Sequence, residues 1–307
     1  MPQALPNPPA LAAAENRRKL GSHERTLHAP WLLRFWHLAS LDAPSVAAVW
    51  ALAFAWAAQV RLPVGIVAAV ALVVWAAYIT DRILDARRAF EHGRVDLLRE
   101  RHFFHWRNRR SLVPLAVVAA AASAVLVPSL IRATAAERDA VVAVGAAVYF
   151  TRVHARRRGE PAGAPPRFAL KEFLVGVLFT AGCVLPAWNR TLARPWELVA
   201  PAALFAATAW LNCTAIDIWE SEHRVSAARL SLFFTGCTLC AAGLAAASVT
   251  AAQHPRSAAL LLAGAVSAAL LGLLDRIKSR MEPLLLRAAA DLALLTPLAV
   301  LLARGRG

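Results

Sequence analysis

The sequence predicts an all-α membrane protein whose chain crosses the bilayer nine times. Three observations predict this fold class: the apolar composition, a series of apolar runs of membrane-span length, and the distribution of basic residues between those runs. Hydrophobic residues make up 59% of the 307 residues and the mean hydropathy is +0.50, which is more apolar than an ordinary soluble domain. The composition therefore indicates a chain that lies largely in lipid.

Nine apolar runs have the length of a membrane-spanning helix. Such a helix needs about 20 mostly apolar residues to cross the hydrocarbon core. The fourth run is shorter than the others, and the bounds of the Ala-rich runs can shift by about three or four residues. The runs cover residues 43–60, 63–80, 112–131, 139–152, 170–188, 196–216, 230–250, 257–274 and 284–302.

The basic residues divide unequally between the segments that join these runs. When the N-terminus is placed in the cytoplasm, the cytoplasmic segments contain 26 of the 34 Lys and Arg residues, and the outer segments contain 8. This division follows the positive-inside rule and predicts a multi-pass protein of the cytoplasmic (inner) membrane with its C-terminus outside. It also accounts for the net charge of +15, so no nucleic-acid partner is expected. The cytoplasmic segments in this arrangement are 1–42, 81–111, 152–171, 217–229 and 275–287.

The chain is expected to form a single domain behind a tail. Residues 1–29 are rich in Pro, Ala and charge and are predicted to form a disordered cytoplasmic tail without a signal peptide, because charged residues interrupt its apolar stretches. Residues 30–307 are predicted to form the nine-helix domain. It begins with an interfacial helix at 30–42, where aromatic residues mix with cations.

Two acidic groups follow the second and the sixth apolar run, both at predicted cytoplasmic helix ends. Asp81 and Asp85 are four residues apart, so they share one side of a helix. Asp217, Glu220 and Arg224 have i, i+3, i+7 spacing, so a continued helix places them on one face. Carboxylates are hard oxygen ligands that suit Mg²⁺, and Mg²⁺ commonly bridges to phosphate oxygens. Together with the Arg-rich loops, the two acidic groups predict a site for an amphiphile with a diphosphate head and a hydrocarbon tail.

Each of these features also has a structural explanation. Asp81 equally well pairs with Arg82 or with another cation at a helix end. Asn212, one turn inside the sixth run, either faces a cavity or hydrogen-bonds a neighbouring helix. His102 and His105 flank two phenylalanines, which favours anchoring at the membrane interface over metal ligation.

The order of the motifs resembles the UbiA superfamily of intramembrane prenyltransferases. Residues 81–85 (DRILD) match half of the Asp-rich motif that ends the second helix of that family. Residues 217–222 (DIWESE) are similar to its second acidic motif, after helix six. Residues 171–176 (KEFLVG) resemble the K-E-x-x-x-G segment that enters helix five, and Tyr149 stands where the family often has a Tyr. The resemblance extends from about residue 30 to the C-terminus.

This resemblance implies nine helices around a central cavity and Mg²⁺-dependent binding of a polyprenyl diphosphate. The chain differs from the family pattern in both acidic motifs. It has Ala77 and Tyr78 where the family has Asn-Asp in the first motif, and His223 and Arg224 near the expected last Asp of the second motif. The implied catalytic residues are Asp81, Asp85, Asp217, Glu220 and Lys171. The four carboxylates among them are the implied metal ligands. The implied diphosphate-binding or cavity residues are Arg82, Arg224, Tyr78, Tyr149 and Asn212.

The resemblance therefore implies a transferase of alkyl groups other than methyl, which passes a prenyl group to an aromatic or other lipophilic acceptor. The alternative is a non-catalytic member of the same fold that binds or transports a lipid. Transporters usually carry ionisable groups near the middle of the membrane, whereas the carboxylates here are predicted at helix ends, which favours the enzyme. The bilayer, the diphosphate and the acceptor are the expected partners, and no protein partner is predicted.

Overall fold

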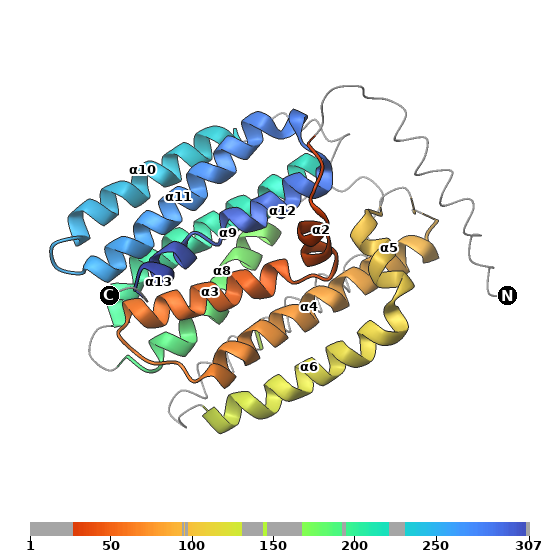
Figure 1. Ribbon diagram of the computed structural model, residues 1–307, viewed down its shortest axis with the longest axis horizontal. Coiled ribbons are helices and arrows are strands. Elements are labelled where there is room, and N and C mark those ends of the chain that lie inside the picture. Colours follow the sequence, from red (N-terminus) through yellow and green to blue (C-terminus); the bar gives the residue numbers. More distant parts are fainter. Residues whose placement is uncertain are drawn as a thin grey trace.

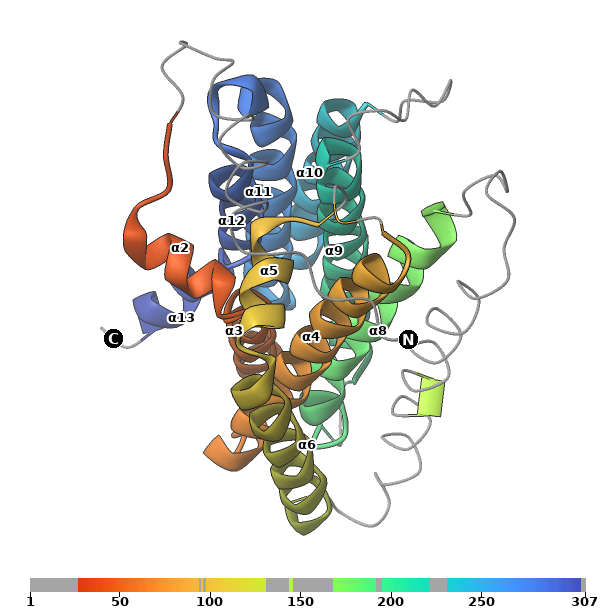
Figure 2. The same ribbon diagram turned by 90° about the vertical axis from the view of Figure 1, so that its right-hand side faces the viewer.

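The computed structural model describes residues 27–93, 95, 98–130, 144–145, 168–191, 195–220 and 231–304, and these residues form a helical bundle. The long helices run side by side in one general direction, as Figures 1 and 2 show. Apart from an isolated bridge between Leu27 and Met281, these residues contain no β-structure. The prediction of an all-α fold is confirmed for this part of the chain. The helices are α2 (Trp31–Leu38), α3 (Asp42–Ala57), α4 (Val64–Glu91), α5 (Glu100–Arg107), α6 (Arg109–Leu130), α8 (Phe168–Trp188), α9 (Val199–Glu220), α10 (Leu232–Thr250), α11 (Pro255–Ile277), α12 (Pro283–Ala293) and α13 (Pro297–Arg304), with 3₁₀ turns η2 (Pro195–Leu198) and η3 (Lys278–Arg280).

The described helices are those of a multi-pass membrane protein. Six are long and apolar enough to cross a membrane, and two bent pairs, α2 with α3 (85°) and α12 with α13 (49°), each have the composition of one further span. These eight candidates coincide with eight of the nine predicted runs. The fourth run, 139–152, lies outside the described residues except for 144–145. The six single candidates are Val64–Glu91, Arg109–Leu126, Lys171–Trp188, Pro195–Glu220, Leu232–Thr250 and Pro255–Arg280.

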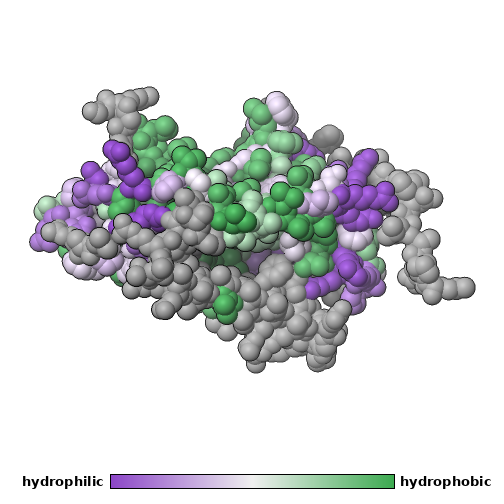
Figure 3. All heavy atoms as spheres, turned by 90° about the horizontal axis from the view of Figure 1, so that it is seen from below, coloured by the Kyte–Doolittle hydropathy of each residue, from purple (hydrophilic) through white to green (hydrophobic). Residues whose placement is uncertain are grey.

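Large apolar side chains are exposed along the middle of the bundle. Figure 3 shows hydrophobic residues across the central part of one face and hydrophilic residues gathered toward both ends. Large apolar side chains such as Val117, Val125, Phe234 and Val249 are more than 60% exposed. Exposed apolar side chains of this number and size are unfavourable in water but match the hydrocarbon core of a bilayer.

The chain bends sharply between α2 and α3. Ser40 has a φ of 53°, a left-handed conformation that ends α2, and the indole N–H of Trp75 donates to the carbonyl of Ala39 at 3.0 Å. Trp31 and Phe35 are exposed on α2, whereas His37 on the same helix is buried. The predicted helix over 30–42 is therefore an eight-residue helix followed by a turn, and its placement at a membrane interface stays a prediction.

The core is centred on Trp50 of α3. Its ring stacks on Phe205 of α9 with 3.8 Å between the ring centroids. Its indole N–H donates to the carbonyl of Leu294 at 2.8 Å, at the break between α12 and α13. A broken helix leaves carbonyls without an intrahelical donor, so this bond provides a partner for one of them inside the bundle.

Two glycines allow neighbouring helices to approach closely. A Cβ atom added at Gly176 of α8 would lie 2.8 Å from the carbonyl oxygen of Ala206 and 2.9 Å from the backbone nitrogen of Trp210, both on α9. At Gly236 of α10 it would lie 2.7 Å from the carbonyl oxygen of Ala268 on α11. Small residues at such crossings are typical of membrane helices, whose association depends on close packing.

Candidate functional site

A buried polar layer lies at the end of the bundle that carries α2 and α5. It consists of residues from six helices, and most of its side chains are buried. Burying this many polar and charged groups is costly unless they pair with one another or bind a ligand. The layer is formed by His37, Asp42, Arg82, Arg101, His102, His105, Asn212, Glu220, Arg287 and Asp291.

Glu220, the last residue of α9, holds two arginines. Arg101 of α5 donates to both carboxylate oxygens, at 2.7 and 2.8 Å, and Arg287 of α12 donates to one of them at 2.7 Å. Burial and the neighbouring Arg287 lower the pKa of Arg101 to about 10, which leaves it charged at neutral pH. The backbone carbonyl of Glu220 also accepts a hydrogen bond from Arg99. The carboxylate therefore ties three helices together, and the role of Glu220 as a Mg²⁺ ligand stays a prediction.

Arg82 of α4 contributes the most deeply buried cation. Its side chain is 3% exposed, and within the described part of the chain its Nε and Nη2 have no hydrogen-bond partner. The guanidinium lies over the ring of Tyr78, one helical turn earlier, at 5.4 Å from the centroid. Arg82, Arg101 and Arg287 are all close enough to His102 to act on its charge. The three guanidinium groups together form a cationic environment suited to an anion.

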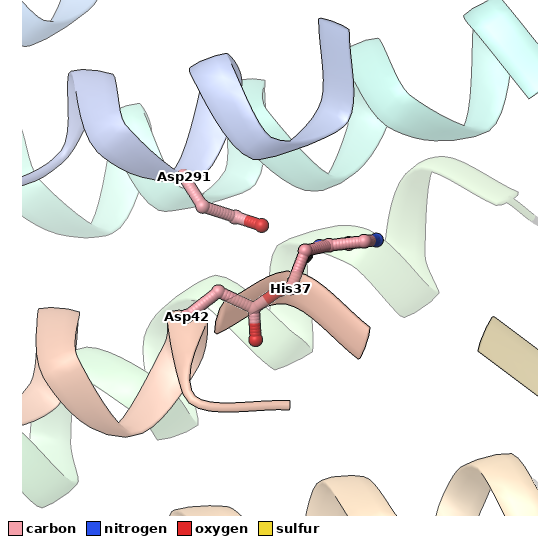
Figure 4. A group of neighbouring side chains, drawn as sticks. All are labelled: His37, Asp42 and Asp291. Atoms are coloured by element: carbon pink, nitrogen blue, oxygen red, sulfur yellow. Dashed lines mark hydrogen bonds and ion pairs between the residues drawn. The ribbon is translucent and has the colours of Figure 1, made fainter. Parts of the chain in front are cut away.

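A second group contains a histidine and two aspartates (Figure 4). His37 Nδ1 lies 2.7 Å from Asp42 Oδ2 across the bend between α2 and α3. Asp291 approaches them from α12, and the ligating atoms of all three side chains lie within 4.8 Å of one another. Asn212 of α9 donates its side-chain N–H to Asp291 Oδ1 at 3.1 Å. Among the described residues, this is the one group of three or more His, Cys, Asp or Glu side chains with the spacing of a metal site.

The predicted aspartates lie on helices but do not form a comparable group. α4 continues beyond the predicted end of its apolar run, so Asp81 and Asp85 lie on one uninterrupted helix. Both, like Asp217 on α9, are partly buried, and Asp85 lies 3.9 Å from Arg88. Whether these carboxylates bind a metal stays a prediction.

Of the remaining predicted site residues, the structure describes Lys171 and Asn212. Lys171 and Asp217 are both close enough to Glu172 to act on its charge, so the start of α8 lies beside the end of α9. Asn212 is buried and donates a hydrogen bond to Asp291 of α12, so of the two roles that the sequence left open it has the bond to a neighbouring helix. Tyr149 and Arg224 lie outside the described residues.

Two histidines of α5 are buried, although the sequence favoured a place at the membrane interface. His102 Nδ1 accepts a hydrogen bond from the backbone N–H of Arg99, and burial with nearby arginines lowers its pKa to about 2. His105 donates from Nδ1 to the carbonyl of Arg101 at 2.7 Å, so its Nε2 accepts from the hydroxyl of Ser40 at 3.2 Å. Burial lowers the pKa of His105 to about 4. Both rings are therefore neutral at pH 7 and hold α5 against the bend after α2.

A pocket of about 440 Å³ lies at the other end of α3. Its lining includes Gln59, Arg190, Glu197, His254 and Arg256, and Glu197 pairs with His254 at 3.2 Å. None of the predicted site residues lines it, so it is separate from the buried polar layer.

Sequence reasoning missed seven residues of the buried polar layer: His37, Asp42, Arg101, His102, His105, Arg287 and Asp291. One signal was present: Asp291 falls inside the ninth apolar run, and an ionisable residue within a span usually has a function or a partner. Comparison of the chain with family models, with curated proteins and with solved structures finds no match. The assignment of function therefore depends on the residues themselves.

Proposed function

We propose that the protein is a prenyltransferase of the UbiA type, with nine membrane helices and its buried polar layer at the cytoplasmic side of the inner membrane. It transfers a prenyl group from a polyprenyl diphosphate to an aromatic or other lipophilic acceptor. The observation that carries this proposal is the buried guanidinium of Arg82, which has two nitrogens without a partner among the described residues. It lies at the end of an apolar bundle, where the headgroup of a lipid-like diphosphate would be bound.

The arginines supply most of the binding energy for the headgroup in this proposal. Arg82 donates to the diphosphate, while Arg101 and Arg287, held by Glu220, add positive charge around it. Because charge accumulates on the diphosphate as its bond to the prenyl carbon breaks, fixed cations stabilise that transition state more than the ground state. Lys171, at the start of α8, serves as a further cation for the leaving group.

Mg²⁺ is the cofactor of this proposal. Asp81, Asp85 and Asp217 would hold it through their carboxylate oxygens, which are the ligand type that Mg²⁺ prefers. Its chemistry is to neutralise the diphosphate. Glu220 is left out of this ligand set because its oxygens accept hydrogen bonds from arginines.

The second candidate is a non-catalytic lipid-binding protein or transporter of the same fold. One observation favours it: Tyr78 and the arginine-bound Glu220 leave three carboxylates where the resembling family has more. A site that is rich in arginine and poor in metal ligands can still bind an anionic lipid.

The decisive experiment measures binding and turnover separately. Purified protein in detergent is given geranyl, farnesyl and longer prenyl diphosphates with and without Mg²⁺, and both ligand binding and pyrophosphate release are recorded. The proposal expects Mg²⁺-dependent release that Asp81→Asn abolishes and Arg82→Gln lowers by about 100-fold or more, since a charge-assisted contact is lost in the transition state. Arg87→Gln is the matched control on α4, because Arg87 is exposed and pairs with Glu91.

Each outcome separates the two candidates. Binding that needs Arg82 but gives no pyrophosphate release supports the lipid-binding protein and overturns the enzyme. Absence of both binding and release, in protein that melts cooperatively, overturns both. An Arg82→Gln protein that turns over like the Arg87→Gln protein refutes the assigned role of Arg82.

A further inference from the structure

We infer that His37, Asp42, Asp291 and Asn212 form a binding site for one divalent transition-metal ion of the Zn²⁺ or Mn²⁺ class. This site is distinct from the Mg²⁺ of the proposed function, and the inference does not depend on that function. It uses residues of α2, α3, α9 and α12, all within the buried polar layer.

The ligand atoms already have nearly the separation that such an ion imposes. Metal–ligand bonds of about 2.0–2.2 Å place neighbouring ligand atoms roughly 3 Å apart. His37 Nδ1 and Asp42 Oδ2 are joined by a hydrogen bond of 2.7 Å, whose proton a metal ion would replace. The ligating atoms of His37, Asp42 and Asp291 lie within 4.8 Å of one another. Only small side-chain rotations are needed for all three to reach one ion. In Figure 4, Asp291 extends from α12 toward the other two.

Asn212 provides an independent indication of a ligand. Its side chain is 6% exposed and is directed at Asp291 through the 3.1 Å bond from Nδ2, yet its Oδ1 has no partner among the described residues. A buried amide oxygen without a partner costs about 1–3 kcal/mol. Rotating the amide by half a turn would exchange the two atoms. The oxygen would then lie close to Asp291 Oδ1, at the spacing of two ligands on one cation.

The charges of the group also call for a cation. Asp42 is 1% exposed, and Asp291 faces it inside a membrane bundle, where two neighbouring carboxylates repel each other strongly. A divalent ion between them would neutralise the two carboxylates. Asp42 is also in the first turn of α3, where the helix dipole stabilises a carboxylate.

Two arginines lie nearby, but neither occupies this position. Arg287, one turn before Asp291 on α12, is bound to Glu220. Arg82 acts electrostatically on both His37 and Asp42, and no hydrogen bond to either is formed in the described structure. The cations therefore lower the affinity for a metal ion without filling its site.

The ligand types select the class of metal. One imidazole with carboxylate and amide oxygens suits ions such as Zn²⁺ and Mn²⁺, whereas Mg²⁺ prefers oxygen alone and keeps several waters. His37 and Asp42 are buried, so little room is left for water. Because the ligands come from four helices, the ion would fix the bend between α2 and α3 to α9 and α12 and would stabilise the folded state.

The test is metal binding by tag-free, full-length protein in detergent. After removal of bound metal with a chelator and re-addition of Zn²⁺, Mn²⁺ or Mg²⁺ alone, the expected result is about one Zn²⁺ or Mn²⁺ per chain with a higher melting temperature, and no such effect of Mg²⁺. Asp291→Asn and His37→Gln should each weaken binding by about tenfold or more. Asp275→Asn is the matched control, since Asp275 pairs with Lys278 and Trp219.

Asn212→Ala keeps the test decisive if loss of a carboxylate prevents folding. It removes only the fourth ligand, so it should lower affinity while the protein still melts cooperatively. Two results would overturn the inference. One is no Zn²⁺ or Mn²⁺ binding by folded wild-type protein, which would mean that the two carboxylates share a proton instead. The other is binding that is equal in wild type, Asp291→Asn and Asn212→Ala. Pyrophosphate release plays no part in these readouts, so failure here is distinguishable from failure of the proposed function.

Discussion

Replacing Glu220 with Gln should destabilise the protein strongly and without any involvement of Mg²⁺. The carboxylate accepts three hydrogen bonds of 2.7–2.8 Å from Arg101 and Arg287, whose side chains are 9% and 13% exposed. Removing one partner of a buried ion pair costs about 3–5 kcal/mol. Because the Glu220 side chain is 28% exposed, solvent screening reduces this figure, and we expect about 2–3 kcal/mol.

The assay is thermal or denaturant unfolding of purified protein in detergent, with and without Mg²⁺. Glu100→Gln is the control: Glu100 pairs with Arg34, and both side chains are more than 40% exposed, so this change should cost less than about 1 kcal/mol. The double variant Glu220→Gln with Arg101→Gln should recover part of the loss, because it leaves fewer buried cations unpaired.

Two results would refute this reasoning. Equal unfolding of the Glu220→Gln and Glu100→Gln proteins would show that Glu220 does not hold the arginines. A loss of stability that appears only with Mg²⁺ present would assign Glu220 to the metal, as the sequence predicted, in place of the arginine contacts.

Two further predictions concern helix contact and pH. Gly176→Ala places a Cβ atom 2.8 Å from a backbone carbonyl oxygen of α9 and should lower the stability of the folded protein by about 1–3 kcal/mol. The control Gly182→Ala, whose Cβ atom meets nothing within 4 Å, should be neutral or slightly stabilising. Equal melting temperatures of the two variants would contradict this prediction. His105 has a folded pKa of about 4, below the 6.5 of the unfolded chain, so the unfolded state takes up the proton first and stability falls as pH drops from about 6.5 toward 4. Between pH 7 and 5.5 His105 alone should contribute about 1 kcal/mol to the loss of stability. A His105→Gln protein with the same pH slope as the wild type would disprove this contribution.

Local sequence determined the helices well because membrane helices follow from composition. Every backbone group in hydrocarbon must be hydrogen-bonded within the protein, and an apolar run long enough to cross the bilayer achieves this within its own segment by forming a helix. Eight predicted runs coincide with candidate spans for this reason. The end of a helix was less predictable than its apolar part. α4 continues beyond its apolar run through Asp81 and Asp85 to Glu91, because hydropathy does not report where a helix ends once it has left the membrane.

The contacts of the candidate site, unlike the helices, could not be predicted from local sequence. The pairing of Glu220 joins residues 119 and 67 positions away, and no local pattern distinguishes a carboxylate that meets two arginines from one that holds a metal ion. Asp291 meets Asn212 across 79 residues. Which charges meet depends on helix crossing angles and on bends such as the one at Ser40, both of which are set by packing.

The sequence by itself thus determined that the chain is a helical, multi-pass membrane protein with acidic groups after its second and sixth apolar runs. Only the tertiary structure decided which of its charges are paired with each other. It assigned Glu220 to the arginines and brought His37, Asp42 and Asp291 together. The physical reason is that hydropathy acts along each segment separately, whereas the energy of a buried charge depends on the partners that distant segments bring to it.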